Sequence, residues 1–384
     1  MENQNKIAIA TIALKNSYNY GNKLQTYALQ EYLRKCGYIP ETIRYQSDYV
    51  QEMKAPPRSS IIEKLKKQSA LQSFSDAYRI INRTVQKSTL EKKRTNREKK
   101  FKSFENAYIN YTKETYYADS DYSNLIRRND FFITGSDQVW NPYYEGTNAF
   151  FYLGFAPKGK RIAYAPSIAH NEIPEGLKSQ YSKWLSQIDY LSIREDAGRI
   201  LLKEEYGLDA KLVCDPVFLL SRKEWHDIAI RPQKEERYFA VYILGKKTVK
   251  IKKLIRQYGK KYQIRPLDIY SKDEVPSAFA GPEEFLGILE NSEFVFTDSF
   301  HGTAFSLIFN KPMVLVDRDG NKKTSSRVNS ILQVLDIESR DAEWILNNSS
   351  KMALDYSDVE RKLACFIDDS EAFLLGALRR ACKE

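Results

Sequence analysis

Short apolar runs alternate with amphipathic segments along this chain, as strands and helices do in α/β proteins. Near the start, the apolar run 6–14 predicts a buried strand, a polar loop covers 15–22, and 24–35 has helical spacing. Gly37 lies just beyond that helix, where glycine commonly ends one. A second strand is expected near 42–45. This β-loop-α-β opening is typical of doubly wound sheets.

The pattern changes between about residues 50 and 117, where charged residues dominate and apolar residues recur at helical spacing. Residues 54–102 hold 15 Lys/Arg against 4 Asp/Glu, an excess of 11, whereas the whole chain carries +10. We predict a basic helical insertion in the first domain. The charge fits a solvated helical face, or a patch for an anionic membrane surface or a phosphorylated lipid-linked substrate. No recognition motif accompanies it, so we expect no nucleic acid as a partner.

The remaining elements follow the same alternation. Apolar, β-prone runs predict strands at 130–134, 161–165, 190–193, 211–215, 238–244, 263–269, 294–296 and 313–316. Helical spacing predicts helices at 174–185, 249–258, 283–290, 303–309, 331–335 and 357–382. We expect an N-terminal α/β domain at 1–215, a linker at 216–236, a C-terminal α/β domain at 237–350 and a helical segment at 351–384.

The bulk properties limit the class of protein. A length of 384 residues suggests two domains, and 42% hydrophobic residues suffice for their cores. No apolar run reaches the roughly 18 residues of a membrane span, and the start of the chain does not resemble a secretory signal. The cysteines show no CxxC pair, so we interpret them as free thiols in the cytoplasm. We also expect no metal site.

Residues 293–310, EFVFTDSFHGTAFSLIFN, predict a strand, a tight turn and a helix. Such a junction directs backbone N–H groups and the positive end of the helix dipole toward the carboxyl edge of a sheet, where an anion can bind. We therefore predict an anionic ligand beside a proton donor, at Ser299, His301, Gly302 and Thr303. A lone histidine is more often structural, and we interpret His170 and His226 in that way.

Two loops of the first domain carry polar groups at the ends of predicted strands. The segment 19–25 (NYGNKLQ) opens the first helix, and 135–141 (GSDQVWN) follows the strand 130–134. Substrate hydroxyls are often held at a position such as 135–141, and the helix N-terminus at 19–25 can hold an anion. A capping loop and an Asx turn are the structural alternatives. We predict that a substrate with hydroxyl groups, called the acceptor below, contacts Asn19, Gly21, Asn22, Ser136, Asp137 and Gln138.

Arg194 ends the predicted strand 190–193, and a guanidinium there could bind a carboxylate or phosphate through two hydrogen bonds. The alternative is a local ion pair with Glu195 or Asp196. Further cations follow the strand 313–316, namely Lys322, Lys323 and Arg327.

Six segments together resemble the polysaccharide pyruvyltransferase family, in the same order along the chain. They are 19–30 (NYGNKLQTYALQ), 135–141 (GSDQVWN), 192–195 (SIRE), 215–220 (DPVFLL), 281–286 (GPEEFL) and 297–312 (TDSFHGTAFSLIFNKP). The resemblance implies an α/β fold of two Rossmann-like halves facing a central cleft, like GT-B glycosyltransferases. It also implies transfer of a pyruvyl group from phosphoenolpyruvate to a sugar as a cyclic ketal, with phosphate released and no further cofactor.

By the same resemblance, Arg194 grips phosphoenolpyruvate and His301 acts as acid or base. The family's basic residue after the following strand falls on Lys322 or Lys323, and we add Asp137 as the group that holds or deprotonates the acceptor. Many members carry Arg-Leu-His where this chain has 299–301 as Ser-Phe-His. We expect Arg327 or Lys323 to replace the missing guanidinium.

The expected acceptor is a sugar of a cell-surface polysaccharide precursor, often lipid-linked. We expect such an enzyme to be cytoplasmic. Contact of the basic region 54–102 with the inner face of the membrane is an additional possibility. Two other functions are considered: a GT-B-type glycosyltransferase that uses a nucleotide sugar, and a non-catalytic module that binds a phosphate ligand.

Overall fold

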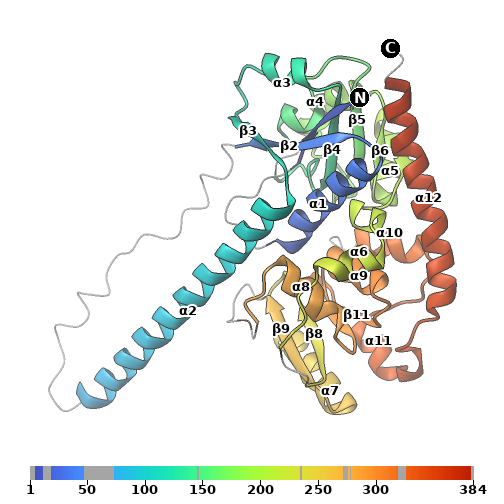
Figure 1. The fold of residues 1–384 in the computed structure, drawn as a ribbon. Coiled ribbons are helices and arrows are strands. Elements are labelled where there is room, and N and C mark those ends of the chain that lie inside the picture. Colours follow the sequence, from blue (N-terminus) through green and yellow to red (C-terminus); the bar gives the residue numbers. More distant parts are fainter. Residues whose placement is uncertain are drawn as a thin grey trace.

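Two α/β halves, each built on a parallel sheet, make up the body of the molecule (Figure 1). The computed structural model describes residues 5–11, 19–46, 73–144, 147–233, 236–270, 276, 278–318 and 326–381, and of residues 73–90 it describes the backbone. No helix in these ranges is both long and apolar enough to cross a membrane.

The first half contains a five-stranded sheet in the order β3-β2-β1-β4-β5, with every neighbouring pair parallel. Its strands are β1 Lys6–Ala10, β2 Ile39–Tyr45, β3 Tyr111–Tyr116, β4 Phe131–Asp137 and β5 Arg161–Pro166. The chain reverses its winding direction between β1 and β4, and ligands of doubly wound sheets bind outside the carboxyl ends of strands at such a point. This edge carries the start of the first helix and the end of β4.

The helices of the first half cover this sheet and lead toward the second half. They are α1 Tyr20–Lys35, α2 Ser73–Tyr108, α3 Ser123–Arg128, α4 Glu175–Leu185 and α5 Asp196–Tyr206, with a short 3₁₀ turn η4 at Ala149–Tyr152. A small parallel pair, β6 Ser192–Ile193 and β7 Lys211–Leu212, continues beyond β5. Helix α1, which the sequence predicted at 24–35, begins four residues earlier, at Tyr20, directly after its N-cap Asn19.

The insertion predicted at 50–117 includes a strand of the sheet. Residues 47–72 lie outside the described residues, and α2 supplies the predicted helix. Residues 111–116, however, form β3, an edge strand paired with β2. Edge strands keep polar, charged residues on their open side, and YTKETY buries Thr112 and Tyr116 while exposing the three residues between them. Its polarity therefore reflects its edge position.

The second half contains a four-stranded parallel sheet in the order β11-β10-β8-β9. Its strands are β8 Tyr238–Tyr242, β9 Arg265–Tyr270, β10 Val295–Thr297 and β11 Met313–Leu315. Its helices are α7 Val249–Tyr262, α8 Pro282–Glu290, α9 Phe300–Ile308, α10 Ser326–Val334 and α11 Ala342–Asn347, followed by the 3₁₀ turn η8 Ser349–Lys351. Between the halves lie η5 Pro216–Leu219 and α6 Arg222–Ile228, so the predicted linker is largely helical.

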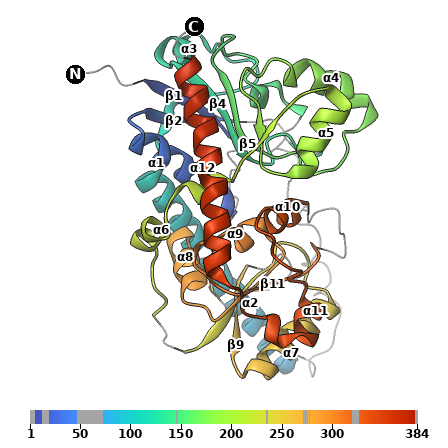
Figure 2. The ribbon, with the colours of Figure 1, turned by 90° about the vertical axis from the view of Figure 1, so that its right-hand side faces the viewer.

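The last helix, α12 Tyr356–Ala381, runs along both halves (Figure 2). At its start, the Tyr356 hydroxyl donates to the Lys311 carbonyl of the second half. Further along, the Ser370 hydroxyl accepts a hydrogen bond of 2.9 Å from the Cys214 N–H of the first half. The C-terminal segment therefore ties the two halves together.

Candidate active site

The predicted catalytic side chains come from strand ends of both halves. Asp137 ends β4, Arg194 follows β6 and His301 lies in the first turn of α9 after β10. A fourth residue, Asp215, is the N-cap of η5, where its carboxylate accepts from the Val217 N–H at 3.1 Å. These strands belong to three different sheets, and the packing of the sheets and of the two halves brings the groups at their carboxyl ends together.

Arg194 is enclosed, and its side chain has no solvent exposure. Its two terminal nitrogens donate to Asp215 at 2.6 Å and to Asp137 at 3.1 Å. The Phe300 ring lies 4.8 Å from the guanidinium carbon, as in a cation–π contact. The local partners considered from the sequence contribute less, since Glu195 is 4.0 Å away and Asp196 bonds to Arg199.

Asp215 connects the two halves. Its Oδ2 accepts from Arg194 and from the Ser136 hydroxyl at 2.9 Å, both in the first half. The same oxygen lies 3.7 Å from Nε2 of His301 in the second half, a distance of an ion pair rather than a hydrogen bond. Burial alone would raise the pKa of Asp215, but the interactions with His301 and Arg194 outweigh it and hold the pKa well below its usual range.

The other side of the His301 ring lies against Gly21 at the start of α1. A Cβ added to Gly21 would stand 1.9 Å from Nδ1 of His301. No larger residue fits there unless the ring moves. The imidazole is thus held between α1 and Asp215, with 7% of the side chain exposed.

Asp137 has a φ of 65°, in the left-handed region. Aspartate tolerates this conformation better than most residues. Burial would raise the pKa of Asp137, but Arg194, His301 and Arg327 together lower it. Both aspartates of the cluster are therefore ionised at neutral pH.

Arg327, on α10, is 7% exposed, and within the described ranges its guanidinium has neither a hydrogen-bond nor an ion-pair partner. Burial, together with the nearby charge of Arg194, lowers its pKa to about 10. A buried guanidinium without acceptors is costly. Arg327 is therefore the cation of this cluster that an added anion would stabilise most.

The remaining donor residues predicted at 299–303 shape the helix start. Ser299 is the N-cap of α9, with the Gly302 N–H at 3.5 Å from its hydroxyl. The Thr303 hydroxyl donates to the Ser299 carbonyl at 3.1 Å. A Cβ on Gly302 would stand 2.4 Å from the Thr297 hydroxyl, so glycine lets α9 pack on β10. These three residues support the turn that carries His301.

The predicted acceptor residues of the first half are mostly engaged within their own loops. Asn19 caps α1 by accepting from the Asn22 N–H at 3.3 Å, and Asn22 is 1% exposed. Gln138 accepts from the Asn141 amide at 2.7 Å. Ser136 is buried and bonds to Asp215. Of these loops, the cluster itself contains Gly21, Ser136 and Asp137.

Lys322 and Lys323 lie outside the described residues. The first described cation after β11 is Arg318, which the sequence reasoning did not single out. It donates to the Asp298 carboxylate at 3.1 Å and to the Asp298 carbonyl at 3.2 Å. Its charge also contributes to the lowered pKa of Arg327. Among the described residues no group of His, Cys, Asp and Glu could hold a metal ion.

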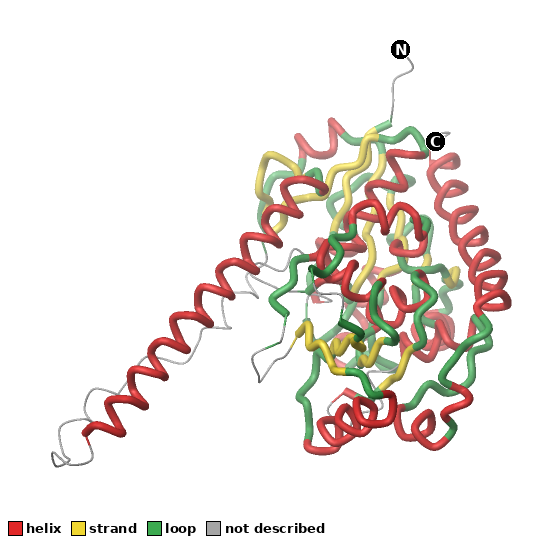
Figure 3. Tube along the Cα trace, turned by 60° about the horizontal axis from the view of Figure 1, so that its bottom comes forward, coloured by secondary structure: helices red, strands yellow, loops and turns green. Residues whose placement is uncertain are grey.

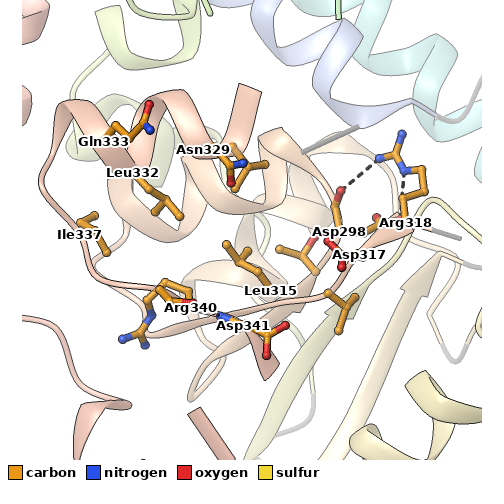
Figure 4. Close-up of a pocket in the computed structure, with 14 residues that line it drawn as sticks. Asp298, Leu315, Asp317, Arg318, Asn329, Leu332, Gln333, Ile337, Arg340 and Asp341 are labelled. Carbon is orange, nitrogen blue, oxygen red and sulfur yellow. Dashed lines mark hydrogen bonds and ion pairs between the residues drawn. The ribbon is translucent and has the colours of Figure 1, made fainter. Parts of the chain in front are cut away.

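A cavity lies beside this cluster of side chains. It has a volume of about 570 Å³ and lies between α10 and the segments that follow β10 and β11 (Figure 4). Asn329, Leu332 and Gln333 line it from α10, and the Asp298–Arg318 ion pair borders it at one end. The predicted donor and acceptor residues are not among those that line it.

The family model for polysaccharide pyruvyl transferase matches residues 19–320, which include Gly21, Asp137, Arg194, Asp215 and His301. The chain belongs to the polysaccharide pyruvyl transferase family. Its members are transferases, and the resemblance read from the six motifs is thereby confirmed. No curated protein matches the sequence.

This family member has a GT-B-like fold of two Rossmann-like halves, and solved structures resemble it in fold. A structure assigned as a UDP-N-acetylglucosamine 2-epimerase from Listeria monocytogenes has a TM-score of 0.50 at 9% identity, covering 97% of this chain and 95% of its own. UDP-GlcNAc 2-epimerase from Neisseria meningitidis has a TM-score of 0.48 at 9% identity, covering 98% and 100%. The glycosyltransferase SnogD from Streptomyces nogalater has a TM-score of 0.43 at 11% identity, covering 98% of each chain. At these identities the likeness concerns the fold.

In this pyruvyl transferase family member, Asp215 is the residue of the cluster that sequence reasoning missed. The motif DPVFLL contributed to the resemblance, but no role was assigned to its aspartate. The available signal was an acidic residue directly before a proline, which favours an N-cap and a short helical turn. What brings Asp215 to His301 is the packing of the halves, which the local pattern does not contain.

Proposed function

We propose that this protein transfers a pyruvyl group from phosphoenolpyruvate to two hydroxyls of one sugar of a cell-surface polysaccharide precursor. The product is a cyclic ketal, and phosphate is released. The single observation that supports this most is the contact between Asp215 and His301, because it joins the motifs of both halves into one charged cluster. Family membership supports the transferase reaction more broadly.

The reaction needs a proton donor and a cation. One hydroxyl proton of the sugar ends on the methylene carbon of phosphoenolpyruvate, which becomes a methyl group. The first sugar oxygen bonds to the central carbon, phosphate leaves with its oxygen, and the second sugar oxygen closes the ketal. The second hydroxyl proton leaves with phosphate or solvent. Protonation of the methylene carbon makes the central carbon electrophilic. The acid must therefore lie beside the methylene carbon.

His301 is the proposed acid and base. A positioned proton-transfer group contributes on the order of 10²–10⁴-fold in rate. Asp215 orients the imidazole and stabilises its protonated form, as a buried carboxylate does for a catalytic histidine. Asp137, from the opposite half, is the proposed group for the acceptor hydroxyl.

Arg327 is the proposed donor-binding cation and takes the place of the family arginine absent at Ser299. Phosphoenolpyruvate combines a carboxylate with a phosphate of up to about two negative charges. An anion beside Arg327 would give this buried guanidinium the acceptors that it lacks among the described residues. Arg194 is enclosed by carboxylates, so its proposed role is to hold Asp137 and Asp215. A direct contact of Arg194 with the donor stays a prediction.

The test combines donor binding with turnover. Calorimetry with phosphoenolpyruvate measures donor affinity without an acceptor, and phosphate release with glycolipids extracted from the source cells measures transfer. His301→Ala should reduce phosphate release by at least about 100-fold and leave donor affinity within a few-fold of the parent. The matched control is His226→Ala, since His226 is exposed and pairs with Glu290 away from the cluster. Retained transfer in His301→Ala would reject the acid–base assignment.

A parallel thermal-shift experiment addresses the rival glycosyltransferase. Stabilisation by a nucleotide sugar and none by phosphoenolpyruvate would replace the proposed reaction with nucleotide-sugar chemistry. Donor binding without phosphate release from any extract would favour a binding module.

A further inference from the structure

The outer face of α2 carries a stripe of lysines. Helix α2 projects from the body of the molecule (Figures 1 and 3). In its described part, Arg97, Phe101 and Phe104 are buried against the body. Lys92, Lys99 and Lys102 are exposed, and they make no ion pair with another described residue. Their spacing of seven and three residues sets them together on the side opposite the buried stripe.

Contacts with both halves fix the rotation of this helix. Lys100 pairs with Glu284 of α8 at 2.6 Å in the second half. The Arg97 guanidinium donates to the Tyr20 hydroxyl at 2.5 Å at the start of α1 in the first half. A helix held at two points on one side cannot turn about its axis. The lysine stripe therefore faces away from the body.

The composition of this outer face favours a flat anionic surface over a nucleic acid. On the same face as the lysines lie the small polar residues Thr95, Ser103 and Asn106, all exposed. Nucleic-acid sites combine charge with aromatic side chains for stacking or with arginine for bidentate contacts. A stripe of lysine point charges suits a diffuse negative potential. Two exposed carboxylates, Glu91 and Glu98, lie along one margin of the stripe.

We propose that the outer face of α2 docks the protein on an anionic lipid surface. The part of α2 that packs on the body lies close to the candidate active site. Its Arg97 bonds to Tyr20, and the next residue, Gly21, lies against His301. Docking would thus hold the site close to a membrane that carries lipid-linked glycans. This inference goes beyond the proposed reaction and does not depend on the donor.

The test measures the partition of the full-length protein onto phosphatidylcholine vesicles with and without 30% phosphatidylglycerol. The parent should bind the anionic vesicles and lose binding as salt rises, because screening weakens surface electrostatics. Each lysine near such a surface contributes about fivefold, so Lys92→Gln/Lys99→Gln/Lys102→Gln should weaken the partition by about 100-fold. The corresponding triple Lys→Arg variant should keep it.

A matched control removes the same charge from scattered positions. Lys158, Lys183 and Lys253 are exposed and lie on separate segments. Their triple Lys→Gln variant should bind within a few-fold of the parent. Equal binding by the stripe variant and the parent would overturn the proposal, as would equal loss in both variants. Binding of the parent to duplex DNA but not to anionic vesicles would assign the stripe to nucleic acid instead.

Discussion

The imidazole of His301 occupies the space that any side chain at position 21 would need. A Cβ at Gly21 would stand 1.9 Å from Nδ1 and 2.3 Å from Cγ of that ring. Gly21 is the second residue of α1 in the first half, whereas His301 is the second residue of α9 in the second. The absence of a side chain in one half is therefore a condition for the position of the histidine in the other.

Gly21→Ala should displace the His301 ring from Asp215 and reduce turnover by about 100-fold, the scale of an error of about 1 Å in a catalytic group. Overpacking should also lower the free energy of unfolding by about 1–3 kcal/mol. Phosphate release and chemical denaturation measure these effects. Gly176→Ala is the matched control, because nothing lies within 4 Å of a Cβ there and Gly176 is helical. That control should be neutral or stabilised by up to about 1 kcal/mol.

Asp215→Asn should retain the shape of the site but remove the charge that Arg194 and His301 share. We expect a loss of phosphate release of at least about tenfold, since one buried orienting carboxylate is removed. The free energy of unfolding should fall by about 3 kcal/mol, because a buried guanidinium loses part of its neutralisation. Asp209→Asn is the control, as its ion pair with Lys203 is exposed and is worth at most about 1 kcal/mol. Equal effects in the two variants would contradict the role of Asp215.

The pH dependence of stability should also reveal this cluster. The pKa values of Asp137 and Asp215 are lower in the folded state than the ordinary value. Their contribution to stability is therefore full above the unfolded value of about 4, and it is lost progressively as the pH falls from there toward their lower folded-state pKa values. The free energy of unfolding of the parent should thus fall more steeply than that of Asp215→Asn as the pH is lowered from about 5 to about 2. Parallel curves would show that Asp215 is not held ionised by the fold.

Tyr20 joins α1, α2 and the second half through one hydroxyl. It accepts a hydrogen bond from Arg97 at 2.5 Å and donates one to the Ala280 carbonyl at 2.9 Å. Tyr20→Phe should lower the free energy of unfolding by about 1–3 kcal/mol, because buried partners lose their hydrogen bonds. Tyr144→Phe, at a residue 54% exposed, should change it by less than about 0.5 kcal/mol. Denaturation curves of the two variants decide the matter.

The strand–turn–helix at 293–310 shows what sequence reasoning predicts well. A short β-prone run, a polar turn and an apolar helix are local properties, and β10 and α9 lie where the pattern indicates. The order of motifs was sufficient for the family and, with it, the GT-B-like fold. The edge strand β3 was missed because its polarity resembles that of a helical insertion.

The environment of Arg194 shows what local patterns leave open. Its neighbours in sequence, Glu195 and Asp196, were the obvious candidates for an ion pair. Its partners in the structure are Asp137 and Asp215, which are 57 and 21 residues away. Such pairing depends on which strand ends meet at the sheet edge and on how the halves pack. A sequence therefore identifies an arginine at a strand end without revealing whether carboxylates already enclose it.

Arg327 should lower the free energy of unfolding of the protein and raise its affinity for phosphoenolpyruvate. Its pKa is lowered to about 10 from 12.5, so the folded state disfavours its charge by about 3 kcal/mol. Arg327→Met keeps much of the side-chain volume and removes the charge. The free energy of unfolding should therefore rise by about 1–3 kcal/mol, while the affinity for phosphoenolpyruvate should fall by about tenfold or more.

Arg340 provides the contrast, because it is also buried but donates to three backbone carbonyls, those of Met313, Lys351 and Met352. Arg340→Met leaves these acceptors without a donor and should lower the free energy of unfolding by about 3 kcal/mol or more. Donor affinity measured below the melting temperature should stay close to that of the parent. If Arg327→Met instead destabilised the protein as Arg340→Met does, then Arg327 would be a structural residue of the fold. The cation for the donor would then have to be sought elsewhere.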